Sequence, residues 1–148
     1  MKALIQRVKQ ASVNINQSEY SKISKGLLIL VGIHKNDSVD DIKFIIDKSI
    51  NLRIFSDEND KFNYSALDIR SELLIVSQFT LHADTSKGRR PSFFDSALPD
   101  NAEKLYDQVI DEYNKTGLEI KTGEFGAKME IDLINDGPVT IMLDSHMK

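Results

Sequence analysis

Three side chains able to hydrogen-bond, Ser77, Gln78 and Thr80, follow a run of four apolar residues at Leu73–Val76. Such a run is typical of a strand buried on both faces. A buried strand that ends in polar groups is a rigid support for reactive side chains. The same pattern also describes a core strand whose polar end only satisfies nearby backbone, which is the commoner case. Taken alone, residues 73–84 favour this second interpretation, and the rest of the chain reverses it.

Most familiar catalytic motifs are absent. The sequence has no glycine–lysine phosphate loop, no dinucleotide glycine fingerprint and no Gly-x-Ser-x-Gly turn. Its histidines, His34, His82 and His146, are not paired at the spacing of metal ligands, so we expect no metal site. In an extended segment Ser77 and His82 lie about 16 Å apart, too far for direct proton transfer. The sequence therefore predicts no Ser–His–Asp triad, and we expect no cofactor.

Composition is that of an ordinary globular protein. The 148 residues, 41% hydrophobic and 28% charged, suit one domain spanning residues 1–148. No apolar run approaches the ~18 residues of a membrane span, and Gln6, Arg7 and Lys9 interrupt the start too early for a secretory signal. Cysteine is absent, which excludes disulfides and thiol nucleophiles. We expect a cytoplasmic protein with no membrane partner.

The net charge of −4 is opposite to that of a general nucleic-acid binder. Lys87, Arg89 and Arg90 nevertheless form a local basic group in a polar loop. This loop either contacts a nucleic-acid backbone or is an ordinary solvated loop.

The apolar pattern predicts more strand than helix. We expect strands at 3–8, 11–15, 26–33 and 52–55, with turns at 16–19 and 56–60. The tail reads as a hairpin in which strands 129–133 and 139–143 are joined by a turn at Asn135–Pro138.

Two helices complete the expected fold. The first follows Ser38, which forms a capping-box-like start with Asp41. The second begins at Pro99-Asp100 and stops near Gly117. The sequence thus predicts a single α+β domain in which sheet predominates and two helices cover it.

Two longer stretches resemble the D-aminoacyl-tRNA deacylase family. They are Ser77–Asp84, with the sequence SQFTLHAD, and Asn135–Ser145, with the sequence NDGPVTIMLDS. Supporting matches occur at 5–8, 88–93 and 125–129, in the right order and at the right separations. The resemblance runs from Met1 to Ser145, and only His82 and Met142 fall where the family varies.

The resemblance implies a mixed, barrel-like sheet and a homodimeric hydrolase. Family members remove a D-amino acid, or mischarged glycine, from tRNA by cutting the ester to the 3′-terminal adenosine. By this resemblance Gly137-Pro138 carries a cis peptide bond and enters the partner subunit's active site. Its backbone rejects L-amino acids there, and Arg7 holds the turn in orientation.

The resemblance places the chemistry at the end of the buried strand. In one mechanism Thr80 is a nucleophile, although no base stands beside it. In the one we favour, water attacks with help from the ribose 2′-hydroxyl, and backbone N–H groups near Phe79 and Thr80 stabilise the oxyanion. Ser77 and Gln78 then hold the substrate.

Two residues are candidates for the pocket of the terminal adenine. Phe125 and Met129 offer an aromatic and a thioether face on which a base packs. Met129 also fits its alternating strand as plain core, and this role is the more natural one.

Two other functions compete with the deacylase. A non-catalytic tRNA-binding or editing-associated module can keep the same fold, but it has no need of both intact motifs. A general small-ester hydrolase would cleave free amino-acid esters as readily as aminoacyl-tRNA. The missing triad and the implied reliance on the ribose hydroxyl count against it.

Overall fold

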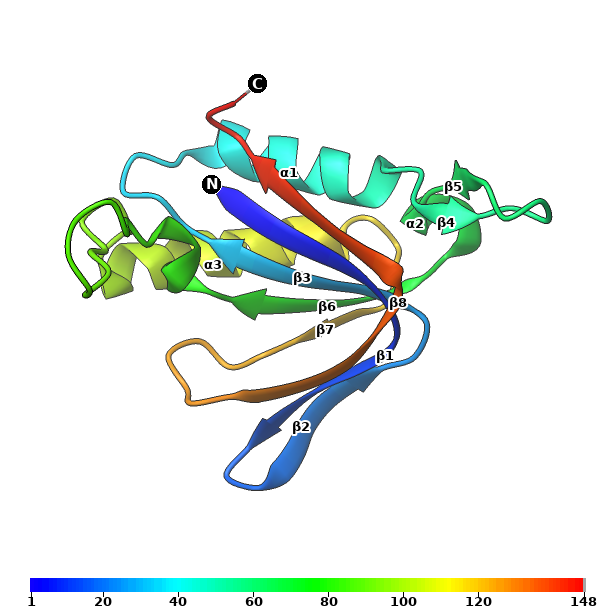
Figure 1. Ribbon diagram of the computed structural model, residues 1–148, viewed down its shortest axis with the longest axis horizontal. Helices are drawn as coiled ribbons and strands as arrows, with labels where there is room; N and C mark the ends of the chain where they lie inside the picture. The colour runs from blue at the N-terminus through cyan, green and yellow to red at the C-terminus, as the bar shows by residue number, and fades with distance from the viewer. Residues whose placement is uncertain (148) are drawn as a thin grey trace.

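A six-stranded mixed sheet forms the centre of the structure, a computed structural model that describes residues 1–147 (Figure 1). β3 pairs antiparallel with β1 and parallel with β6, which in turn pairs parallel with β7. β8 runs antiparallel to β1 along nearly its whole length. The strands are β1 (Lys2–Ile15), β2 (Ser18–Ile23), β3 (Gly26–Gly32), β6 (Glu72–Ser77), β7 (Ile120–Thr122) and β8 (Glu130–Asp144).

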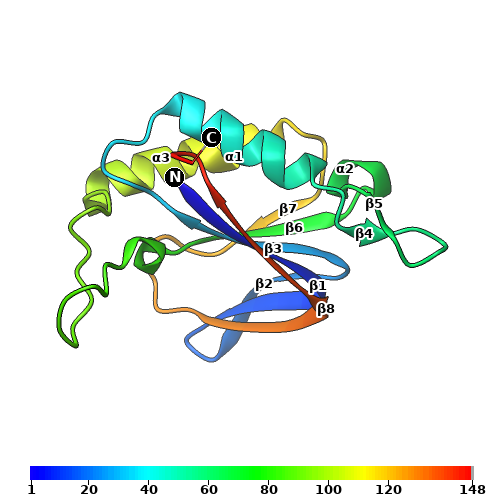
Figure 2. The ribbon, with the colours of Figure 1, turned by 45° about the horizontal axis from the view of Figure 1, so that its top comes forward.

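The sheet curls until it is nearly closed. The long strands β1 and β8 bend, so that β2 lies beneath β6 and β7 (Figures 1 and 2). Across the remaining gap the Ser21 hydroxyl donates a 2.7 Å hydrogen bond to the Thr122 carbonyl. The barrel-like α+β fold expected from the sequence is confirmed.

Two helices cover the outer face of this sheet. α1 (Val39–Asn51) and α3 (Pro99–Asn114) lie side by side above β1, β3 and β6 (Figures 1 and 2). The remaining elements are short: β4 (Phe55–Ser56), β5 (Phe62–Tyr64), α2 (Ala66–Ile69) and the 3₁₀ turn η1 (Phe79–His82). No helix within residues 1–147 has the length and apolar character needed to cross a membrane.

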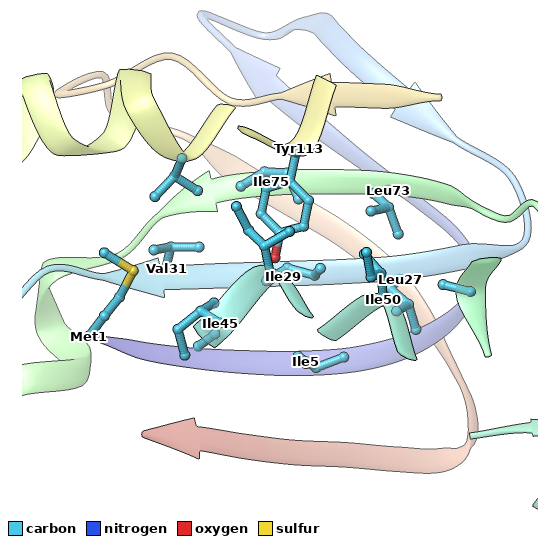
Figure 3. Close-up of a cluster of buried hydrophobic side chains, with 14 of the residues drawn as sticks. Met1, Ile5, Leu27, Ile29, Val31, Ile45, Ile50, Leu73, Ile75 and Tyr113 are labelled. Atoms are coloured by element: carbon cyan, nitrogen blue, oxygen red, sulfur yellow. The ribbon is translucent and has the colours of Figure 1, made fainter. Parts of the chain in front are cut away.

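Two apolar cores explain why β3 and β6 are continuous apolar runs. Leu27, Ile29 and Ile75 face the helices, where the fully buried Tyr113 shares a 2.8 Å hydrogen bond with Ser49 (Figure 3). Leu28 and Leu74 point to the other face, into a smaller core enclosed by the curled sheet. Because side chains alternate along a strand, a strand buried on both faces is apolar at every position. These two cores hold the end of β6 rigidly.

Some sequence predictions of local structure are wrong. Residues 3–8 and 11–15 form one strand, β1, and residues 52–54 are not strand. β2 was not predicted, because its outward residues are polar. The expected hairpin at the tail is absent: β8 is one strand, since it finds its partner in β1 rather than in itself.

The start of α1 is as predicted. Ser38 is the N-cap, and its backbone N–H donates a 2.8 Å hydrogen bond to the Asp41 carboxylate. Burial by itself raises the pKa of Asp41, but hydrogen bonds from Ser145 and Ser38 outweigh it and lower that pKa to about 2. Asp41 therefore links the start of α1 to the end of the chain.

Candidate active site

The polar residues after β6 form a tight turn on a rigid base. The Gln78 N–H donates a 2.7 Å hydrogen bond to the Val31 carbonyl of the neighbouring strand β3. From Phe79 the chain enters η1, and the Gln78 side-chain amide donates a hydrogen bond to the Thr80 hydroxyl. Phe79 and Thr80 are both exposed, Phe79 to 56%. The buried strand thus presents polar and backbone groups to solvent.

A mainly apolar pocket of about 570 Å³ opens beside this turn. Ser77, Gln78 and Phe79 line one side, while Phe125 and Met129 line another. The Phe79 ring meets Phe93 edge-on, with 4.9 Å between centroids. The ring centroids of Phe125 and Tyr106 lie 5.8 Å apart. The Tyr106 hydroxyl donates a 2.9 Å hydrogen bond to the Ile75 carbonyl. Thr80 stands outside the lining of the pocket.

Met129 belongs both to the core, as its alternating strand suggests, and to the lining of the pocket. Its side chain packs against the smaller core and also lines the pocket. Gly123 allows this position, because a Cβ there would lie 2.6 Å from the Met129 sulfur.

The Gly137–Pro138 turn lies in a bulge of β8. Val8 pairs with Asn135 and Gln6 with Thr140, so four residues of β8 stand opposite Arg7 alone. The Gly137–Pro138 peptide bond is cis, and both residues are exposed.

Gly137 is required by this backbone. Its φ of +142° is rare for residues that carry a side chain. A Cβ there would also lie 2.7 Å from Cγ2 of Val139 and 3.1 Å from the Arg7 guanidinium. The bulge is therefore packed tightly on its inner side.

Arg7 fixes the inner side of the turn. Its Nε donates a 2.9 Å hydrogen bond to the Asp136 carbonyl, and Nη1 donates a 2.6 Å bond to the Ile54 carbonyl. The Arg7 side chain is only 9% exposed, and its guanidinium lies over the ring of Phe62 at 5.3 Å. Because a guanidinium is a rigid fork, these bonds hold the turn against the end of α1.

Asn135 braces the same turn from within, a role that the sequence reading missed. Its side-chain oxygen accepts the Val139 N–H at 2.7 Å, and its amide donates to the Val139 carbonyl at 3.2 Å and the Thr140 hydroxyl at 2.9 Å. An Asn two residues before Gly-Pro could have predicted this role, since Asn side chains often form hydrogen bonds with nearby backbone.

The two regions do not meet within one chain. Ser77 is level with Val31 and Ala3 across the sheet, whereas Arg7 lies four residues further along β1. At the usual rise per residue, Ser77 and Arg7 are about 13 Å apart along the strand direction. They are also on different strands, because β3 lies between β6 and β1. In Figure 1 the tip of β6 and the bend of β8 lie at opposite ends of the sheet, as they do in Figure 2. The turn therefore does not reach its own chain's pocket.

Comparison with known proteins assigns this arrangement to a family. The model of the D-Tyr-tRNA(Tyr) deacylase family matches residues 4–144. The chain belongs to this family. The D-aminoacyl-tRNA deacylase of Thermosipho africanus (strain TCF52B) is 55% identical over 145 residues, covering 98% of this chain and 97% of its relative. The deacylase of Halothermothrix orenii is 52% identical, covering 99% and 98%.

Solved structures share the fold. A structure described as the c-Myc DNA Unwinding Element Binding Protein superposes with a TM-score of 0.92 at 40% identity, covering 97% of this chain and 98% of that one. A second, described as a probable eukaryotic D-amino acid tRNA deacylase, has a TM-score of 0.84 and covers 96% and 97%. Its 16% identity carries the fold alone.

No general base stands beside Thr80 in this member of the family. Among the contacts of residues 1–147, the Thr80 hydroxyl bonds only to Gln78. His82, two residues on, is buried, and its Nε2 has no partner within the described chain. Burial lowers the pKa of His82, which favours the neutral ring. The hydrogen bonds of residues 1–147 therefore give the Thr80 hydroxyl no base that would activate it as a nucleophile.

Charge is divided between two exposed regions near the pocket. Lys87, Arg89 and Arg90 stand on the exposed loop 84–92, which two backbone hydrogen bonds between Asp84 and Ser92 close at its base. A separate shallow groove on the other side of Phe125 carries four carboxylates: Glu103, Asp107, Asp111 and Glu124. A phosphate backbone is attracted by the loop and repelled by the groove.

Proposed function

We propose that this deacylase hydrolyses the ester bond of D-aminoacyl-tRNA, and of glycine mischarged on tRNA, in cytoplasmic translation quality control. The observation that carries the proposal is the Gly137–Pro138 turn, exposed on its outer side and held on its inner side by Arg7 and Asn135. A rigid turn of bare backbone has the properties of a filter for chirality.

The filter works by steric exclusion. Carbonyl groups of the turn face the α-carbon and amino group of the substrate, where an L-side chain collides with the backbone. A D-amino acid or glycine avoids the collision, so one site serves many side chains. Exclusion requires that the turn cannot retreat, which is the task of the bonds from Arg7.

The turn acts in the pocket of a second copy of the chain. It lies about 13 Å along the strands from the polar turn of its own chain, as the register of β1, β3 and β6 dictates. Along β8, Ile134 precedes the turn and Met142 follows it, and each is 49% exposed. Exposed apolar side chains beside a functional loop suit a homodimer interface.

The reaction needs no nucleophile from the protein. The first N–H groups of a 3₁₀ turn have no partner inside it, so those of Phe79 and Thr80 are available to an oxyanion. Ser77 and Gln78 hold the aminoacyl group, and water attacks with help from the ribose 2′-hydroxyl. An aminoacyl ester is already activated, and positioning supplies much of the rest.

The tRNA end enters through the apolar pocket. The terminal adenine packs against Phe125 and Met129, which line it. The acceptor backbone runs along the basic loop with Lys87, Arg89 and Arg90, away from the acidic groove.

The decisive experiment follows deacylation of matched D-tyrosyl-tRNA and L-tyrosyl-tRNA with catalytic amounts of protein. Rapid loss of the D form, with the L form spared, is the expected result. Similar loss of both forms indicates a general esterase and rejects the backbone filter. Binding of tRNA without turnover indicates a non-catalytic tRNA-binding or editing-associated module.

A further inference from the structure

The three histidines of the chain, His34, His82 and His146, are far apart in sequence. Their rings nevertheless lie close together at one end of the sheet. The ring of His34 lies 4.9 Å from that of His146 and 5.5 Å from that of His82, measured between centroids. Spacing along the chain gave no reason to expect this. Their sequence spacing led us to expect no metal site, but the pairing of β1 with β8 brings the end of the chain beside the start of α1, where the three rings meet (Figure 2).

We propose that His34, Asp37 and His146 form a binding site for a divalent transition-metal ion of the Zn²⁺ or Co²⁺ class. One ligand atom from each of the three residues lies within 4.8 Å of the other two. Two imidazoles and a carboxylate are a donor set that such ions favour over Mg²⁺ or Ca²⁺.

Hydrogen bonds between His34 and Asp37 hold the turn that contains both residues. The His34 N–H donates a 2.6 Å hydrogen bond to Asp37 Oδ2, and the Asp37 N–H donates a 3.0 Å bond to the His34 carbonyl. The Asp37 side chain is fully buried, so it has little freedom to move. His34 and Asp37 therefore lose little conformational entropy on binding an ion.

The third ligand is already in contact with the second. His146 Nε2 and Asp37 Oδ1 lie 2.8 Å apart, at hydrogen-bond distance. Two ligands of one tetrahedral ion with bonds of 2.0–2.1 Å stand about 3.3 Å apart. For this pair an ion requires a separation only about half an ångström longer, and the His34 nitrogen, which lies within 4.8 Å of both atoms, closes the remaining distance. Binding through Nδ1 of His34 also displaces its 3.1 Å bond from the Asn36 N–H.

The surrounding charge is compatible with a cation. The Met1 ammonium bonds Ser145 and also Asp37 Oδ1, the same oxygen that faces His146, so an ion must share this carboxylate with the ammonium. Asp41, ionised and hydrogen-bonded to Ser145, the residue before His146, adds a second negative charge at this end of the chain. The region thus holds two carboxylates and one ammonium before the ion arrives.

An ion at this site would hold the segment after β8 close to the start of α1. His146 follows β8, whereas His34 and Asp37 follow β3, so one ion links the two segments. His82, the last residue of η1, packs its ring against that of His34. The site is separate from the proposed deacylation chemistry, and it stands if that function fails.

The test uses the full-length protein, stripped with a chelator and titrated with Co²⁺ at about pH 7.5. We expect one equivalent of Co²⁺ to produce visible absorption bands that Zn²⁺ abolishes by competition. Saturation with Zn²⁺ should raise the Tm by about 5 °C. Because the chain has only three histidines, NMR of the imidazole nitrogens should show His34 and His146 shifting on Zn²⁺ binding.

His146→Gln is the principal variant, because His146 is 43% exposed and its replacement should leave the fold intact. It should lower metal affinity by about tenfold or more. Met147→Gln is the matched control in the same exposed turn and should bind normally. His34→Gln provides a second, independent test. Absence of one-equivalent binding, or binding that both histidine substitutions leave unchanged, overturns the proposal.

Discussion

Arg7 Nε and the carbonyl oxygen of Asp136 lie 2.9 Å apart, across a bulge in which four residues of β8 face one residue of β1. The same guanidinium reaches the Ile54 carbonyl at 2.6 Å, just beyond the end of α1. One side chain therefore ties the exposed Gly137–Pro138 turn to the body of the protein. The chirality filter that we propose depends on this connection.

Replacing Arg7 with lysine should damage both rate and selectivity. Lysine keeps the charge but cannot donate in two fixed directions, so at least one buried carbonyl loses its partner. We expect kcat/KM for D-tyrosyl-tRNA to fall about 10- to 100-fold, with weaker rejection of L-tyrosyl-tRNA. Both substrates are measured by single-turnover deacylation.

Arg53→Lys is the control for this substitution, because Arg53 is exposed and its charge acts on Asp68. It should behave as the parent protein does. If Arg7→Lys keeps full selectivity while remaining folded, the turn does not need Arg7.

Thr80→Ala separates the two mechanisms. If Thr80 only positions substrate with Gln78, its removal should slow D-tyrosyl-tRNA hydrolysis by about tenfold. A nucleophile's removal costs about a thousandfold or more. Rates are compared at saturating enzyme, and circular dichroism checks the fold. Loss of all turnover in a folded Thr80→Ala protein returns Thr80 to the role of nucleophile.

Asp41→Asn should destabilise the protein in a pH-dependent way. The folded pKa of Asp41 is about 2, below its ordinary value of 3.8, so its ionised form is favoured by folding. Its contribution of about 2 kcal/mol is present above about pH 4 and is lost as the pH falls towards 2. Urea unfolding at pH 6 and at pH 2.5 should show a large difference from the parent at the first pH and a small one at the second.

Asp40→Asn is the matched control for Asp41→Asn. Asp40 lies in the same first turn of α1 but is exposed. Its loss should change the free energy of unfolding by less than about 1 kcal/mol at either pH. An equal effect from both substitutions would assign the stabilisation to the helix dipole instead.

The elements that the sequence predicts well are those whose signals are local. The apolar runs of β3 and β6 and the Ser38 cap of α1 act through neighbouring residues, so they can be read directly. The tail was misread because Asn135–Pro138 has the composition of a hairpin turn. Only the long pairing of β8 with β1 converts that turn into a bulge.

The sequence identifies the two motifs of the candidate site but does not predict where they lie relative to each other. Ser77–Thr80 and Gly137–Pro138 carry recognisable residue types, yet sheet register, which no local signal specifies, keeps them apart in a single chain. The histidine cluster was missed for the same reason. His34 and His146 are 112 positions apart, and the pairing of β1 with both β3 and β8 makes them neighbours.

Complementation between two inactive variants should show that the turn acts in trans. Phe79→Asp damages the pocket at an exposed position, and Gly137→Ala damages the turn, because its Cβ would crowd Val139. In a refolded equimolar mixture, half of the dimers pair one chain of each kind and contain one intact site. D-tyrosyl-tRNA hydrolysis should therefore recover to about a quarter of the parent rate. A turn that acts in its own chain gives no recovery, because every site in the mixture then carries one of the two defects.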